Sequence, residues 1–158
     1  MARDVDKEIR EYIESHNVCT IAVADGNNPS AHTVYYVSDG LRVYFESSPS
    51  SDKIRILKSN PKICLTVDED YHDWHKIKGV QLFGRAKIVE GRNALSLEGL
   101  FRKKFPQLSE LGGIPENHVF VEVTPDKIYF LDFEKQLGHK TAYFPKNAGA
   151  GLLSRINW

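Results

Sequence analysis

Residues 31–46 read AHTVYYVSDGLRVYFE, and this stretch decides the fold class. Residues 31–37 and 41–46 are both rich in β-branched and aromatic residues, which favour strands. Asp39-Gly40 lies between them, and this pair supports the positive φ angles that a tight hairpin turn requires. The stretch therefore predicts two neighbouring antiparallel strands.

Further strands and helices are predicted on both sides of this hairpin. Apolar residues at helical spacing predict three helices, at residues 4–16, 51–60 and 92–105. We expect residues 139–158 to be mostly irregular, because they show no clear periodicity. Strand-like composition predicts five more strands, at residues 18–24, 62–68, 78–90, 119–123 and 127–133.

Short turns between successive strands imply antiparallel pairing rather than a doubly wound sheet. Thr124-Pro125-Asp126 has the composition of a turn and is expected to separate the last two strands. Gly79 and Gly84 fall where a long strand would bend, as strands of a small closed barrel do. The predicted fold is mainly β with peripheral helices, in a single domain spanning residues 1–158.

Composition excludes several classes of function. Lysine plus arginine number 21 and aspartate plus glutamate number 21, so the net charge of zero argues against a nucleic-acid-binding protein. The charged N-terminus MARDVDKEIREY is not a signal peptide, and no apolar run approaches the roughly 18 residues of a membrane span. Cys19 and Cys64 lie in apolar runs and are expected to be reduced, although a disulfide between them stays open. We therefore expect a cytoplasmic protein.

Residues 44–57, YFESSPSSDKIRIL, contain the best candidate for a binding site. Four serines precede a predicted helix that carries Lys53 in its first turn, where the helix dipole disfavours a cation. Hydroxyl groups, free N–H groups and a lysine together suit a bound phosphate. The alternative is a serine N-cap followed by a solvated loop. Antiparallel pairing should bring His32 and Thr33 beside residues 46–48, which favours the anion site.

No catalytic residue can be named from the sequence. His72 and His75 lie three residues apart, but a structural zinc site usually needs four ligands and no cysteine pair is near, so we expect no metal. Gln81, Phe83 and Arg85 alternate along one strand and should share a face. No nucleophile or nucleotide-binding motif is present, so any redox or transfer chemistry would come from a cofactor.

The order of motifs resembles a known family. The sequence contains, in order, H-T-V-Y-Y, D-G, V-Y-F-E-S-S-P-S-S-D-K-I, N-P-K-I-C-L-T-V and G-V-Q-L-F-G-R-A. This pattern resembles the pyridoxamine 5'-phosphate oxidase-like, FMN-binding split β-barrel family over residues 18–90, and more weakly over residues 124–133. The resemblance implies a six- to seven-stranded antiparallel split β-barrel that forms a homodimer and binds FMN at the subunit interface.

The resemblance also implies roles for particular residues. Backbone around Val34 and Tyr35 would face the flavin ring, and Gln81 would reach the polar edge of the ring. Trp74 and the segment around His139 and Lys140 would come from the other subunit. The residues implied for the FMN phosphate are His32, Thr33, Ser47, Ser48, Ser51 and Lys53.

The implied activity is that of an FMN-dependent oxidoreductase with a small-molecule redox substrate. In pyridoxamine 5'-phosphate oxidase itself, an arginine typically stands at the position of His32, an Arg-Lys pair at Asp52-Lys53, and an Arg-x-His segment where this chain has residues 138–140. Pyridoxamine phosphate is therefore not the expected substrate. Two alternatives stay open. One is a flavin-binding sensor or stress protein without turnover; the other is a heme-binding variant with His32, His72, His75 or His139 as axial ligand.

Overall fold

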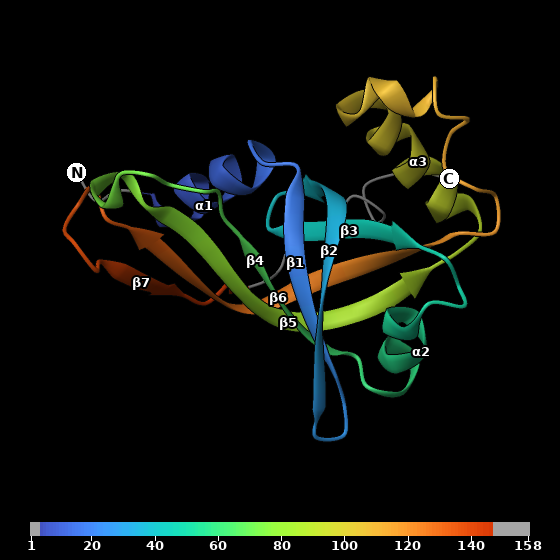
Figure 1. Cartoon of the computed structure of the whole chain (residues 1–158), viewed down its shortest axis with the longest axis horizontal. Coiled ribbons are helices and arrows are strands. Elements are labelled where there is room, and N and C mark those ends of the chain that lie inside the picture. Colours follow the sequence, from blue (N-terminus) through green and yellow to red (C-terminus); the bar gives the residue numbers. More distant parts are fainter. Residues whose placement is uncertain (1–3, 147–158) are drawn as a thin grey trace.

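Seven strands form one antiparallel sheet that closes on itself in the computed structural model, which describes residues 4–146 (Figure 1). The sheet order is β3-β2-β1-β4-β5-β6-β7, and β3 also pairs with β6. Six strands therefore form a closed barrel, and β7 is attached outside it. The strands are β1 (Val18–Asp25), β2 (Asn28–Asp39), β3 (Arg42–Ser47), β4 (Lys62–Val67), β5 (Lys78–Val89), β6 (Val119–Asp132) and β7 (Lys140–Tyr143).

This architecture confirms the predicted fold class, a mainly β protein with an antiparallel barrel and peripheral helices. The helices are α1 (Val5–Glu14), α2 (Asp52–Ser59) and α3 (Arg92–Lys104), and short 3-10 turns occur at η1 (Trp74–Lys76) and η2 (Pro106–Leu108). All three helices begin and end within two residues of their predicted bounds. The hairpin predicted from Asp39-Gly40 is present, and Gly40 has a φ of 60°.

The predicted break at Thr124-Pro125-Asp126 is wrong, because β6 is one continuous strand. Its register against β5 shifts by one residue at this point, where Phe83 pairs with Lys127 and Gly84 pairs with Pro125. A β-bulge tolerates proline, which has no N–H to donate to the neighbouring strand. The bulge needs Gly84, since a Cβ there would lie 2.0 Å from the carbonyl oxygen of Thr124.

The prediction of mostly irregular structure after residue 138 is also wrong for residues 140–143. These residues form β7, which pairs with the second half of β6, while the first half of β6 pairs with β3 (Figure 1). A four-residue strand with a single neighbour is too short to produce a recognisable pattern. The rest of the predicted irregular segment, residues 147–158, lies outside the described residues.

Two apolar clusters hold the fold together. The larger fills the barrel and includes the inward side chains of β1 to β6 together with Ile9 and Ile13 of α1 and Ile54 of α2. The smaller lies between α3 and the outer faces of neighbouring strands, around Phe101 and Phe120. Cys19 is buried, Cys64 is partly buried and both are free thiols. Among residues 4–146, no helix has the length and apolar character needed to cross a membrane.

Candidate functional site

Three of the predicted phosphate ligands meet where β3 leads into α2. Ser47, the last residue of β3, is only 7% exposed. Its Oγ lies 2.9 Å from Oγ of Ser51 and accepts a hydrogen bond of 3.3 Å from Nζ of Lys53. A buried strand end thus brings together two hydroxyl groups and one ammonium group.

The start of α2 adds backbone donors to this cluster. Ser51 occupies the N-cap position, yet its side chain forms no capping hydrogen bond because its hydroxyl contacts Ser47 instead. The first N–H groups of a helix have no partner within the helix and carry partial positive charge. Asp52 also lies in this first turn, but its exposed carboxylate pairs with Arg55 at 3.7 Å. The helix start therefore presents donors beside Lys53.

His32 lies close enough to Lys53 to feel its charge. Burial lowers the pKa of His32 below its ordinary value, the charge of Lys53 lowers this pKa further, and Asp52 opposes the shift. Nε2 of His32 lies 3.0 Å from Oγ of Ser30. A neutral imidazole with a cation nearby would gain from a bound anion, because an anion favours the protonated ring.

The predicted pairing of His32 and Thr33 with residues 46–48 is not what the register shows. β2 and β3 pair only from Tyr36 with Phe45 as far as Asp39 with Arg42. Beyond Phe45, β3 pairs with β6, because closing the barrel turns the end of β3 away from β2. His32 instead pairs with Ile21 of β1 and approaches the cluster through Lys53.

Two of the three residues predicted to contact the flavin ring, Tyr35 and Gln81, lie on the outer face of the barrel, and Val34 faces its interior. Alternation along β2 buries Val34 and turns Thr33 and Tyr35 outward, and Tyr35 is 62% exposed. Gln81 shares this face, because register links Thr33 to Thr20, Thr20 to Thr66 and Thr66 to Gln81. Three strand spacings separate Thr33 from Gln81, or about 14 Å. A single ligand that lies across these strands could contact both Thr33 and Gln81.

Ser48 and Trp74 do not join the hydroxyl cluster. Oγ of Ser48 lies 3.0 Å from Oγ of Ser50. Trp74 is 70% exposed, and the connection between β4 and β5 that carries it lies beside α1, across the molecule from α2 (Figure 1). Within one chain, the connection that carries Trp74 therefore lies apart from the hydroxyl cluster.

The other candidate histidines have local partners. Nδ1 of His75 lies 3.0 Å from the carboxylate of Asp73, and both side chains are largely exposed. Nε2 of His139 lies 3.1 Å from Oγ1 of Thr141. His72 is exposed. Residues 4–146 contain no group of three or more side chains placed to hold a metal ion.

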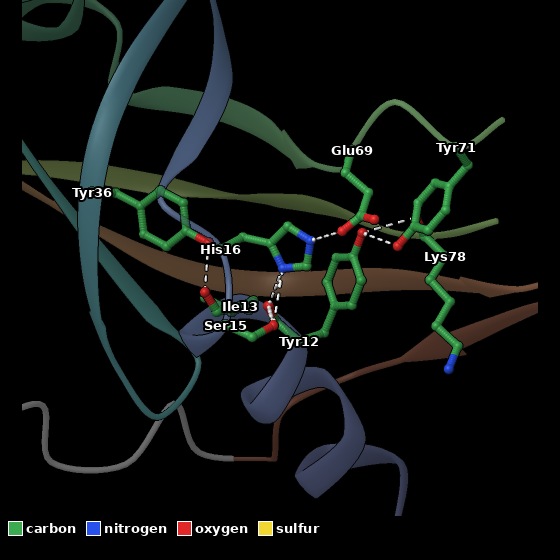
Figure 2. A network of polar contacts seen from close by, with 8 residues as sticks. All are labelled: Tyr12, Ile13, Ser15, His16, Tyr36, Glu69, Tyr71 and Lys78. Atoms are coloured by element: carbon green, nitrogen blue, oxygen red, sulfur yellow. Dashed lines mark hydrogen bonds and ion pairs between the residues drawn. The ribbon is translucent and has the colours of Figure 1, made fainter. Parts of the chain in front are cut away.

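A polar network that the sequence analysis did not predict joins α1 to the barrel (Figure 2). The Tyr12 hydroxyl donates to the carbonyl of Lys78 at 2.9 Å and lies 3.1 Å from the Tyr71 hydroxyl. Nδ1 of His16 lies 2.8 Å from the Tyr12 carbonyl, and Nε2 lies 2.8 Å from the Glu69 carboxylate. Apart from the contact between His16 and Tyr12, these partners are more than 50 residues apart in the chain, so no local pattern could reveal them.

Comparison with known proteins identifies the family. The family model for pyridoxamine 5'-phosphate oxidase matches residues 5–132. General stress protein 26 of Bacillus subtilis (strain 168) is 21% identical over 130 residues, which cover 82% of this chain and 90% of that protein.

Two solved structures, both under a quarter identical, share the fold. A heme binding protein from Mycobacterium smegmatis has a TM-score of 0.76 and 16% identity, over 91% of this chain and 59% of that one. A FAD-binding protein from Mesorhizobium loti has a TM-score of 0.65 and 19% identity, over 80% of this chain and 92% of that one. The family model matches most of this chain, and the chain therefore belongs to the pyridoxamine 5'-phosphate oxidase family.

Proposed function

We propose that this protein binds FMN and acts as an FMN-dependent oxidoreductase on a small-molecule substrate other than pyridoxamine phosphate. The observation that carries this proposal is the cluster of Ser47, Ser51 and Lys53 at the start of α2. FMN ends in a phosphate monoester, and this cluster has the donors and the charge that such a group requires.

The donor set fits a phosphate group. The hydroxyls of Ser47 and Ser51 can both turn their hydrogens toward an incoming oxygen, since they now share a single hydrogen bond. Lys53 supplies a positive charge, and the N-terminal N–H groups of α2 supply further donors. Protonation of His32 would add a second cation when the phosphate binds. These residues hold and neutralise the phosphate.

The flavin ring would extend over the outer face of the barrel. In this arrangement the backbone at Val34 and Tyr35 lies along the ring, and the amide of Gln81 contacts its polar edge. The isoalloxazine supplies the electron chemistry when bound, while the chain positions it. The FAD-binding relative from Mesorhizobium loti supports a flavin ligand for this fold.

We also propose that the working form is a cytoplasmic homodimer. Val18, Tyr35 and Phe83 are large apolar side chains exposed on the outer face. Trp74 is exposed, and the β4–β5 connection that carries it lies on the other side of the molecule from α2, which supports a contact with the flavin of a second copy (Figure 1). Free Cys19 and Cys64 suit a reducing compartment.

The absorption spectrum of the purified protein, with mass analysis of the released ligand, tests the proposal. We expect flavin bands and the mass of FMN. A colourless protein that takes up no added FMN would refute the proposal. Reduction of the bound flavin by NADH or NADPH, followed by reoxidation by a second substrate, would establish turnover.

A second candidate is ligand binding without turnover. General stress protein 26 and the Mycobacterium smegmatis heme binding protein favour this possibility, because their names describe a stress response and heme binding rather than an enzyme. Bound flavin that neither nicotinamide cofactor reduces would support a flavin module. A heme absorption band in the purified protein would support the heme alternative.

A further inference from the structure

Two lysines on the outer face of the barrel lie over the same aromatic ring. Nζ of Lys140 on β7 is 4.0 Å from the ring centroid of Tyr129, and Nζ of Lys127 on β6 is 4.9 Å from it. Lys127 also lies 4.7 Å from the ring of Phe83, which packs edge-to-face on Tyr129 at 5.8 Å. Both ammonium groups therefore lie against the ring of Tyr129.

These two lysines have no carboxylate partner within the part of the chain that the structure describes. Across residues 4–146, neither ammonium group forms an ion pair with a carboxylate or donates a hydrogen bond to an oxygen. An aromatic face attracts each cation but cancels no charge, and the two cations repel each other. An anion that contacts both ammonium groups would offset this repulsion and accept hydrogen bonds from their N–H groups.

A cavity adjoins Phe83, the aromatic residue on which Lys127 lies. It has a volume of about 490 Å³ and is lined by Phe83, Arg85, Lys62 and Cys64, among others. Phe83 belongs both to the cavity wall and to the aromatic pair under Lys127. Asp126 is the one carboxylate among the described lining residues, against two cations. The cavity is large enough for a small molecule, and its charge favours an anion.

The lysine pair lies beside the residue assigned to the flavin edge. Gln81 on β5 pairs directly with Tyr129 on β6, so their side chains are neighbours on one face. A molecule held by Lys127 and Lys140 would therefore lie next to Gln81.

We propose that Lys127 and Lys140 bind the phosphate or carboxylate group of a small molecule whose body occupies the adjoining cavity. This inference rests on the proposed function, because it makes that molecule the redox partner of the flavin. The competing explanation is that Lys140 protects an edge strand from aggregation and that both lysine stems only cover aromatic surface. That explanation requires no ligand.

The site can be tested residue by residue by titrating the FMN-loaded protein with small molecules and monitoring its amide chemical shifts in NMR spectra. The probes are phenyl phosphate, benzoate and benzylammonium. We expect saturable shifts at Phe83, Lys127, Tyr129 and Lys140 with one or both anions and none with the cation. Lys127→Gln and Lys140→Gln should each weaken anion binding by about tenfold or more. Lys127→Arg should retain it, and Lys58→Gln, on exposed α2 surface, should leave it unchanged.

Several results would overturn the inference. One is the absence of saturable shifts at these residues, and another is equal anion affinity in both glutamine variants and the wild type. Salt-dependent binding of single-stranded DNA without binding of phenyl phosphate would assign the patch to a nucleic acid instead. Loss of self-association in the glutamine variants without anion binding would assign it to a contact between copies.

The two proposals fail separately. If the protein takes up no FMN, the same titration on the flavin-free chain still reports shifts at Lys127 and Lys140, apart from shifts at Ser47 and Lys53. Binding there would keep the anion site and refute the flavin.

Discussion

Lys53 places a full positive charge in the first turn of α2, where a cation is normally unfavourable. Its ammonium group donates to Ser47, so the side chain points into the hydroxyl cluster rather than into solvent. In the proposed function, a bound anion offsets the cost of placing this charge there.

Lys53→Ala should therefore weaken FMN binding by about 1.5–3 kcal/mol, the range for a charged hydrogen bond. Fluorescence titration of the flavin-free protein measures the affinity. Lys58→Ala is the matched control, because Lys58 is exposed in the last turn of the same helix and should leave the affinity unchanged. Equal affinity in the Lys53 variant and the wild type would show that the phosphate binds elsewhere.

His32 predicts a pH dependence of stability in the flavin-free protein. Its folded pKa is lowered by burial and by Lys53, so the unfolded chain binds more protons than the native state below about pH 6.5. The free energy of unfolding should then fall as pH decreases from about 6.5 through the lowered pKa. Urea unfolding at a series of pH values measures this fall, and His32→Gln should show less of it. An identical fall in both proteins would mean that His32 does not titrate in this way.

Among the elements, β6 both closes the barrel and binds the extra strand β7. Its first half pairs with β3, its second half pairs with β7, and β5 follows it along its length. The bulge at Pro125 allows the strand to serve both partners. The bulge in turn depends on the missing side chain of Gly84.

Gly84→Ala should destabilise the protein by at least about 2 kcal/mol. The added Cβ would meet backbone atoms of Thr124 and Pro125, which cannot move without breaking the strand pairing. Gly99→Ala is the control: Gly99 lies within α3 with open space around it, so the change should stabilise the fold by about 0.5–1 kcal/mol. Thermal and denaturant unfolding measure both. A harmless Gly84→Ala would mean that the bulge relaxes easily.

For the whole molecule, we propose that two chains together form the flavin site. Trp74 is exposed, and the β4–β5 connection that carries it lies across the molecule from α2 (Figure 1). In the proposed dimer, Trp74 of each copy contacts the flavin bound at α2 of the other copy.

Dilution should therefore release FMN as the dimer dissociates. Analytical ultracentrifugation with absorbance at the flavin band measures both quantities in one experiment. Trp74→Ala should weaken FMN binding without changing the fold, and His72→Ala, on the same exposed loop, serves as its control. FMN that sediments with a monomer at every concentration would contradict the dimeric site.

Features that depend on local chemistry could be predicted from the amino-acid sequence alone. The Asp39-Gly40 turn specifies the hairpin, because its backbone angles are set by the residues themselves. Alternation along β2 and β5 puts Tyr35 and Gln81 on an outer face in the same way. The start of α2 and its serines could also be found locally.

Only the tertiary structure decided which distant groups meet. Pro125 signals a turn in any local context, and it lies within a strand only because Gly84 opposes it. His32 interacts with Lys53 and does not pair with β3. The reason is that closure of the barrel pairs the end of β3 with β6. Lys127 and Lys140 converge on Tyr129 through the pairing of β6 with β7. Such contacts depend on register and closure between segments far apart in the chain, which no local propensity encodes.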